Sequence, residues 1–292
     1  MVFPTMRIPL IALASGALSV LVVTGSAAQA TLSPPPLAAA PSAADPAATA
    51  PAPMAAPAAA KRVFPTVLTK NRLYRSGAVD SFTCSPGEPR AGSANSLKAY
   101  LLKVARCVNG MYARQFRAAG LGAYRVPKII IRASGTKTPC GKLSNTYTAH
   151  YCPSSQTIYQ FLPKATIRNP WGLTLAKTMA HEIGHHAQQR AGIVPAFNRL
   201  YAQARTKTAR NYLSHRVEQQ AECMAGVFLG SVQESLPVVF EEWDQVVDWA
   251  AKHASDTVHG KGRNQAFWLE RGYDSQSFLS CNTWTAPNAR VA

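Results

Sequence analysis

The sequence predicts an α+β domain that is mainly helical, with a small β-sheet and disulfide bonds. Three observations lead to this fold class. Several segments have apolar residues at helical spacing, few segments have the composition of strands, and the 292-residue chain contains six cysteines. No internal repeat is present.

The N-terminus differs in composition from the rest of the chain. Arg7 precedes an uncharged apolar run of 16 residues, Ile8 to Val23, and Ala28-Gln29-Ala30 matches a small-x-small cleavage site. We therefore predict a secretory signal peptide over residues 1–30, cleaved after Ala30, and a secreted, extracellular protein. The alternative is an anchor formed by an uncleaved N-terminal helix, although the run is shorter than the roughly 20 residues of a comfortable span.

Residues 31–60 consist almost entirely of Ala and Pro, which predicts a semi-extended linker. Residues 61–292 then form the folded domain and carry the net charge of +17, because Arg7 and Asp45 cancel. This charge predicts attraction to an anionic surface such as the cell envelope, with simple solubility as the alternative explanation. Lys and Arg are scattered along the chain and no nucleic-acid motif is present, so no specific nucleic-acid partner is expected. Nothing in the sequence indicates an oligomeric state.

The first predicted helix of the domain covers Ser96–Ala119, where apolar residues recur at helical spacing before Gly120. The second covers Leu173–Arg190, between the helix-breaking pair Asn169-Pro170 and Gly192. Further helices are expected over Ser214–Gly226, Val238–His253 and Arg263–Arg271, the last ended by Gly272, and strands over Val126–Ala133 and Thr157–Phe161. Three tryptophans are expected in the core: Trp243, Trp249 and Trp268.

The most informative motif lies in the second of these helices, at His181-Glu182-Ile183-Gly184-His185. Two histidines four residues apart share one helix face and can occupy two corners of a zinc tetrahedron. Glu182 is placed to take a proton from a water that zinc activates. The alternative, a solvated polar turn of helix, is disfavoured by the apolar stripe beside the histidines. His186 points elsewhere and is interpreted as a surface histidine or one that supports the ligands.

A catalytic zinc site needs a third protein ligand. A metzincin would carry Gly and His at the third and sixth positions after the second histidine, but this chain has Gln188 and Ala191 there, which excludes that class. A second helix offers Glu218 and Glu222, one turn apart on the same face. Glu218 could complete the ligand set, and Glu222 could accept the distal N–H of a ligand histidine. Two solvated glutamates on an amphipathic helix are the alternative.

Six cysteines in a chain predicted to be secreted suggest three disulfides, although spacing alone permits fifteen pairings. The short polar loop between Cys140 and Cys152 favours a local bond. Metal binding by Cys223 is a competing interpretation, which its position directly after Glu222 on the helix argues against. The remaining cysteines are Cys84, Cys107 and Cys281.

Several separate blocks of sequence occur in an order typical of one protein family. The blocks are Thr138-Pro139-Cys140-Gly141, Tyr151-Cys152-Pro153, Thr157-Ile158-Tyr159, His181 to His186, Glu218 to Gly226, His259-Gly260, Arg263-Asn264-Gln265, Phe267-Trp268 and Cys281-Asn282-Thr283-Trp284. Over residues 124–284 the chain thus resembles the neutral zinc metallopeptidases of the bacterial gluzincin type.

This resemblance implies a zincin-like metallopeptidase domain with one zinc ion per chain. The ligands it implies are His181, His185 and Glu218, with Glu182 as the general base. One departure concerns the second helix, which usually reads Gln-Ala-Asp-Cys in this family, whereas this chain has Glu222 in place of Asp. The longer side chain leaves open whether Glu222 orients a histidine.

The resemblance also implies that a disulfide joins Cys223 on the second zinc helix to Cys281 in the C-terminal segment. Cys84 and Cys107 then remain as a pair.

The activity that the motif and the resemblance imply is hydrolysis of peptide bonds in a peptide or protein substrate. The oxyanion of such a reaction needs a donor besides zinc, for which His259, His215 and Tyr147 are candidates. His259 is preferred because its His-Gly setting belongs to the resemblance. In gluzincin-like folds an edge strand holds the substrate backbone by strand addition. The alternative function is a catalytically weak, zinc-stabilised protein that binds anionic envelope components through its basic surface, but the presence of Glu182 favours the enzyme.

Overall fold

The computed structural model describes residues 63–292, except for residues 133–136, 143–147 and 237–239. The predicted signal peptide (residues 1–30), the predicted linker (residues 31–60) and Tyr147 lie outside the described residues, so the secretion prediction is not tested. Within the part of the chain that is described, no helix is both long enough and apolar enough to cross a membrane.

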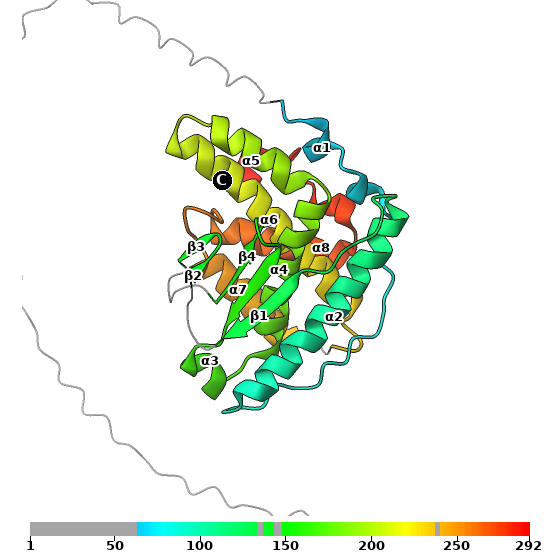
Figure 1. Ribbon diagram of the computed structural model, residues 1–292, viewed down its shortest axis with the longest axis vertical. Coiled ribbons are helices and arrows are strands. Elements are labelled where there is room, and N and C mark those ends of the chain that lie inside the picture. The colour runs from blue at the N-terminus through cyan, green and yellow to red at the C-terminus, as the bar shows by residue number, and fades with distance from the viewer. Residues whose placement is uncertain (1–62, 133–136, 143–147, 237–239) are drawn as a thin grey trace, which may run out of the picture. The chain divides into compact units, whose positions relative to one another are not determined.

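Helices make up most of the domain, as predicted (Figure 1). They are α1 (Thr66–Thr69), α2 (Ala94–Ala118), α3 (Lys164–Arg168), α4 (Gly172–Arg190), α5 (Ile193–Gln203), α6 (Lys207–Ser231), α7 (Phe240–His253) and α8 (Gly262–Ser275). Short 3-10 turns cover Arg72–Arg75, Phe278–Cys281 and Asn288–Arg290. Helices α1, α3 and α5 were not predicted from the sequence. Helices α1 and α3 have only four and five residues, whereas α5 has 11 residues with apolar side chains at helical spacing and was overlooked.

Helix α4 is central because other elements cover it on several sides. It packs against α2, α5, α6 and the sheet, and Leu175, Met179 and Ile183 fill the core from its buried face. The histidine motif therefore sits on a helix that its surroundings hold rigidly.

Helix α2 begins where the Ser93 side chain accepts a hydrogen bond from Ser96 N at 3.2 Å, which satisfies one of the unpaired N–H groups of its first turn.

A three-stranded sheet lies against α4 (Figure 1). Its order is β1 (Lys128–Arg132), β5 (Thr157–Phe161) and β4 (Ala149–Cys152), with β1 parallel and β4 antiparallel to β5. The predicted strands correspond to β1 and β5, whereas β4 was missed. A separate two-stranded hairpin joins β2 (Lys137–Thr138) and β3 (Gly141–Lys142).

Helices α6 and α8 cross unusually closely because glycines line the contact. A Cβ atom at Gly226 would collide with the carbonyl oxygen of Leu269, and one at Gly272 would collide with that of Cys223. The prediction that Gly272 ends the last helix is wrong, because α8 continues to Ser275. Gly272 serves close packing rather than helix termination.

All three expected disulfides are formed, which confirms the pairing. They join Cys84 to Cys107, Cys140 to Cys152 and Cys223 to Cys281. The bond from Cys223 excludes that residue as a metal ligand. It fastens α6 to the C-terminal segment, which the buried Arg216 also holds through the carbonyl oxygens of Thr283 and Ala286.

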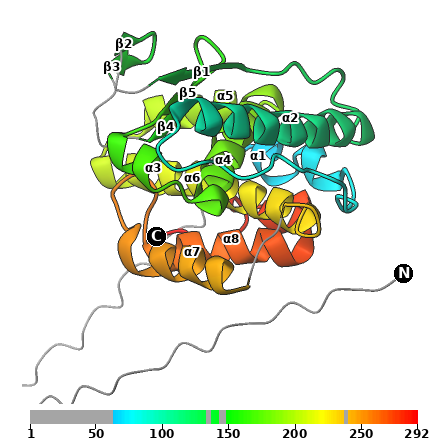
Figure 2. The same ribbon diagram turned by 90° about the horizontal axis from the view of Figure 1, so that it is seen from below.

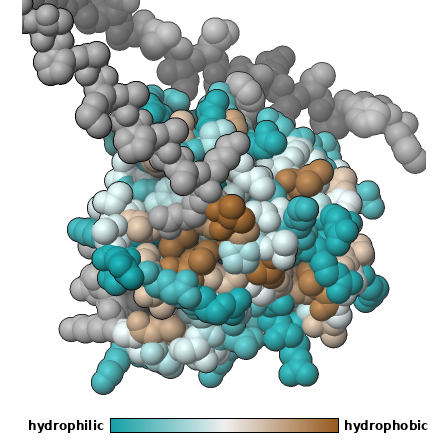
Figure 3. Space-filling view, turned by 90° about the horizontal axis from the view of Figure 1, so that it is seen from above, coloured by the Kyte–Doolittle hydropathy of each residue, from teal (hydrophilic) through white to brown (hydrophobic). Residues whose placement is uncertain are grey.

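Two of the three tryptophans expected in the core are buried there, Trp243 and Trp268. Trp249 is 58% exposed, so that prediction is wrong: it lies on the solvent side of α7. Figure 3 views the molecule from the side of α1 and α5 and shows apolar residues near the middle of that face, with hydrophilic ones around them.

Candidate metal centre

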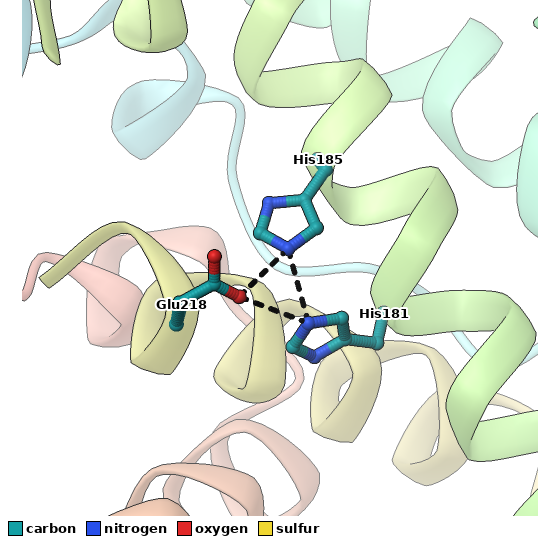
Figure 4. Close-up of side chains that lie close together, drawn as sticks. All are labelled: His181, His185 and Glu218. Atoms are coloured by element: carbon teal, nitrogen blue, oxygen red, sulfur yellow. Dashed lines mark hydrogen bonds and ion pairs between the residues drawn. The ribbon is translucent and has the colours of Figure 1, made fainter. Parts of the chain in front are cut away.

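Three ligand-type atoms converge between α4 and α6 (Figure 4). The Nε2 atoms of His181 and His185 lie 3.1 Å apart, and Glu218 Oε2 lies 3.4 Å from the first and 2.9 Å from the second. Zinc bonds of roughly 2.0–2.2 Å at tetrahedral angles place ligand atoms about 3.3–3.6 Å apart. The observed spacings are close to that, so this group could hold a metal ion.

The hydrogen bonds at the far side of each ring fix which nitrogen faces the centre. His181 Nδ1 lies 2.9 Å from Glu222 Oε2, and His185 Nδ1 lies 2.9 Å from Gln188 Oε1. Both partners are acceptors, so each ring donates its Nδ1–H to them, and with a cation bound at the centre the Nε2 lone pairs would face the cation beside Glu218. Two lone pairs and a carboxylate that converge in this way attract a cation.

Glu222 is oriented from a second side. Lys177 Nζ donates to its Oε1 at 2.6 Å, while Oε2 receives the His181 proton. The longer side chain that stands in place of Asp therefore reaches the histidine. Burial opposes ionisation of Glu222, but the Lys177 charge and the His181 hydrogen bond outweigh it and lower its pKa to about 2.

A chain of buried amides holds His185. Gln188 Nε2 donates to Val217 O at 2.8 Å and to Gln220 Oε1 at 2.9 Å, which turns Gln188 Oε1 toward the ring. Gln220 in turn donates to Cys281 O at 3.0 Å and to Tyr74 Oη at 2.7 Å. This network links the histidine to the disulfide-bonded C-terminal segment.

The charges of the centre favour a bound cation. Burial lowers the pKa of His181, but hydrogen bonds to Glu218 and Glu222 outweigh it and raise that pKa to about 9. Burial would raise the pKa of Glu218, yet the His185 charge and the hydrogen bonds from both rings hold it well below its usual value. Both shifts mean that positive charge placed among these three side chains is stabilised.

Glu182 and the ligand-type residues line one cleft of about 420 Å³. Glu182 is 8% exposed and comes from α4, beside His181. The opposite wall comes from β4, with Ala149, His150 and Tyr151. An apolar end is formed by Val194 and Phe197 of α5 and Val217 of α6.

His259 reaches the same cleft from the loop before α8. Its Nε2 lies 3.5 Å from Glu218 Oε2, and its Nδ1 lies 2.7 Å from Asp256 Oδ2. The other oxygen of Asp256 accepts the backbone N–H groups of Val258 and His259 at 2.7 and 2.6 Å, which fixes the carboxylate. Burial lowers the pKa of His259, but the Asp256 hydrogen bond and the Glu218 charge raise it to about 9.

The pattern of this chain also matches a known family. A family model described as "Putative neutral zinc metallopeptidase" matches residues 87–284, a span that contains every residue of the centre. The chain belongs to this family. The resemblance noted in the sequence is thereby confirmed.

Two relatives share this sequence pattern over most of their length. Both are named "Uncharacterized protein YpfJ", one from Escherichia coli strain K12 and one from Escherichia coli O6:H1 strain CFT073. Each is 27% identical over 219 residues, which cover 68% of this chain and 74% of the relative. No solved structure matches the chain. Family membership implies zinc as the cofactor and a peptidase as the general class of activity. The donor atoms of this centre fit zinc.

The other predicted histidines have different places. His215 Nε2 bonds Thr257 O at 3.2 Å, and this residue is not among those that line the cleft. His186 is fully buried, so the surface interpretation is wrong. Its Nε2 donates to Arg125 O at 2.6 Å, and its Nδ1 accepts from Tyr151 Oη at 3.0 Å. His186 thus fastens β4 to α4.

Sequence reasoning missed Lys177, Gln188, His150 and Asp256. Lys177 and Gln188 flank the motif at one-turn spacing, which is a usable signal on a helix. Asp256 precedes His259 by three residues, a weak signal in a loop. His150 lies in the strand that was not predicted, so nothing connected it with the cleft.

Proposed function

We propose that this protein is a secreted zinc endopeptidase with a zincin-like catalytic domain. The observation that supports this most is the convergence of His181, His185 and Glu218 on one point, in a cleft that Glu182 also lines. In this proposal the first three side chains hold a single zinc ion, and Glu182 is the general base. The zincin-like fold and the secretion are parts of the proposal.

The chain's own groups would move the proton in this reaction. A zinc ion at the centre supplies Lewis acidity, which lowers the pKa of water and polarises a peptide carbonyl. The Glu182 carboxylate takes the proton of the attacking water and then delivers it to the leaving amine. Glu182 is buried and lines the same cleft as the three ligand-type residues, which is where this proton transfer would occur.

His259 would stabilise the developing oxyanion. Asp256 holds the Nδ1–H of the ring, so a proton on Nε2 is directed toward the centre, 3.5 Å from Glu218. A donor fixed before the reaction needs no rearrangement as charge develops, which is why such groups lower the barrier. We therefore assign His259 as the donor and Asp256 as the residue that positions it.

The substrate would bind as an extra strand along β4. Phe161 N donates to Thr148 O at 2.8 Å, and the antiparallel pairing alternates from there. The N–H and C=O groups of Ala149 and Tyr151 consequently face away from β5, toward the open edge of the sheet. An extended peptide can form backbone hydrogen bonds with these groups. This favours an endopeptidase, which binds substrate residues on both sides of the scissile bond.

The test combines zinc content with cleavage of an unfolded protein such as casein. Wild-type protein should contain one zinc per chain and lose activity in a chelator. Glu182→Gln should keep its zinc and lose activity by at least about 100-fold, as expected for removal of a general base. Glu218→Ala should lose zinc.

Each outcome has a distinct meaning. Cleavage that persists in chelator would contradict the proposal. Equal zinc in wild type and Glu218→Ala would show that the third ligand is misassigned. Bound zinc without cleavage of any substrate would favour the zinc-stabilised binding protein.

A further inference from the structure

The acidic residues of this chain are distributed very unevenly. Residues 89–217 contain 20 Lys and Arg but one carboxylate, Glu182, which is buried at the metal centre. Residues 223–292 contain eight Asp and Glu against five Lys and Arg. The basic residues look scattered along the chain, but the absence of acidic neighbours makes whole elements positively charged.

The fold gathers part of this charge on one side. On α2 the solvent side opposite the core stripe carries four exposed bases, and the segment that follows it carries three more on and before β1. We define the basic face by these residues, which are Lys103, Arg106, Arg114, Arg117, Arg125, Lys128 and Arg132. Among the described residues, α2 and β1 contain no Asp or Glu. The segment beside α2 carries Asp80 and Glu88, and Pro86 O in this segment accepts a hydrogen bond from Lys103 Nζ at 3.2 Å, but the seven bases outnumber these two carboxylates.

The acidic elements lie on the other side of the domain. Figure 2 shows α2 and β1 along one side and α7 and α8 along the opposite side. Helices α7 and α8 carry Glu241, Glu242, Asp244, Asp248, Glu270 and Asp274. The domain therefore carries excess positive charge on one side and acidic residues on the opposite side, and a negatively charged surface would attract the first and repel the second.

We propose that the basic face docks the domain on an anionic phospholipid bilayer. The bases stand on the outside of a helix and at a sheet edge, and the cleft of the metal centre is lined by other residues. Such a broad array suits a plane of phosphates better than a single strand of nucleic acid, which usually requires a groove and stacking aromatic rings.

An exposed apolar side chain supports a bilayer over other polyanions. Val126 is 66% exposed and stands between Arg125 and, two positions on, Lys128. A valine beside cations can enter the headgroup region while the cations pair with phosphates, whereas a soluble polyanion offers it no apolar partner. The segment is held firmly, because Arg125 O accepts the 2.6 Å hydrogen bond from His186. This inference does not depend on the proposed peptidase activity.

The experiment measures sedimentation of the full chain with lipid vesicles at about 0.1 M salt. The test variant combines Arg106→Glu, Arg117→Glu and Lys128→Glu. The control variant makes the same change in charge on the α7 and α8 side, with Lys252→Glu, Lys261→Glu and Arg263→Glu. Any affinity of the N-terminal apolar run for lipid is common to all three proteins. Zinc content and circular dichroism confirm that each variant is folded.

Wild type should sediment with vesicles that contain phosphatidylglycerol and remain in solution with pure phosphatidylcholine. One base near an anionic bilayer contributes a factor of about five, so the test variant should bind at least tenfold more weakly. The control variant should lose less than threefold. If both variants lost vesicle affinity equally, the basic face would not be the docking site. If the wild type bound both lipids equally, the cations would not be recognising anionic phosphates. Tighter binding to single-stranded RNA than to vesicles, at equal phosphate concentration, would replace the bilayer by a nucleic acid.

Discussion

At the residue scale, the centre depends on side chains that do not touch the metal position. Gln188 shows this best, because its three hydrogen bonds join His185 to Val217 and Gln220. With both N–H groups occupied, its oxygen has one orientation, which fixes the tautomer of the histidine. A glutamine can therefore control a metal ligand without a charge.

We expect Gln188→Leu to weaken zinc binding by about 10- to 100-fold, since loss of such a partner frees the ring and its tautomer. Competition with a fluorescent chelator measures the affinity. The neighbouring change Gln189→Leu is the control and should leave the affinity within about threefold. Unchanged affinity in Gln188→Leu would mean that packing alone orients His185.

His186 gives a prediction for pH. Burial lowers the pKa of this ring below its ordinary value of about 6.5. Just below pH 6.5 the ring is therefore protonated in the unfolded chain but still neutral in the folded protein. Its contribution to stability is complete above pH 6.5 and is lost as the pH falls below it. We expect the free energy of unfolding to rise more steeply between pH 5 and 6.5 in wild type than in His186→Gln, by up to about 1.4 kcal/mol per pH unit.

Urea unfolding of both proteins in chelator measures this difference without a contribution from zinc. Parallel curves for the two proteins would show that His186 titrates normally in the fold. A steeper curve for the variant would contradict the sign of the shift.

At the element scale, two helix glycines should respond in opposite ways to the same substitution. Gly226 lies where α6 meets α8, and a Cβ there would strike the Leu269 carbonyl. Gly110 lies within α2, where a Cβ would meet only the end of Arg114, at 3.9 Å. The helix propensity gained is the same at both sites, so packing decides the sign.

We expect Gly226→Ala to lower the free energy of unfolding by about 1–3 kcal/mol, and Gly110→Ala to raise it by about 0.5–1 kcal/mol. Chemical denaturation of the two variants beside wild type checks both values. A neutral Gly226→Ala would imply that the two helices can separate at little cost.

At the scale of the whole molecule, the proposed zinc ion would join two helices that are far apart in sequence. His181 and His185 come from α4, and Glu218 comes from α6. Because the ligands converge only in the folded chain, bound zinc stabilises the folded state by mass action.

We expect a chelator to lower the melting temperature of wild type by about 10 °C, which corresponds to a few kcal/mol for a domain of this size. Glu182→Gln should show the same decrease, since it retains the ligands. Glu218→Ala should melt low with or without chelator. An unchanged melting temperature in wild type would argue against a structural contribution from zinc.

The sequence by itself determined the local features of this protein. Two histidines four apart share a helix face because of the helical period, and this holds whatever surrounds the helix. The same period predicted α2 and α4 almost to their ends, and the paired glutamates of α6. The family resemblance added the cysteine pair between Cys223 and Cys281, which spacing alone could not select.

Only the tertiary structure decided which groups meet across elements. Tyr151 sits in a four-residue strand, too short for a periodic signal, yet its pairing with β5 and its bond to His186 put β4 on the rim of the cleft. Glu222 contacts His181 from a helix that is distant in sequence. Asp256 contacts His259 within an irregular loop, whose conformation no periodic pattern predicts. Local sequence sets periodicity and turn chemistry, whereas the position of a side chain in space depends on packing between segments, which no local pattern contains.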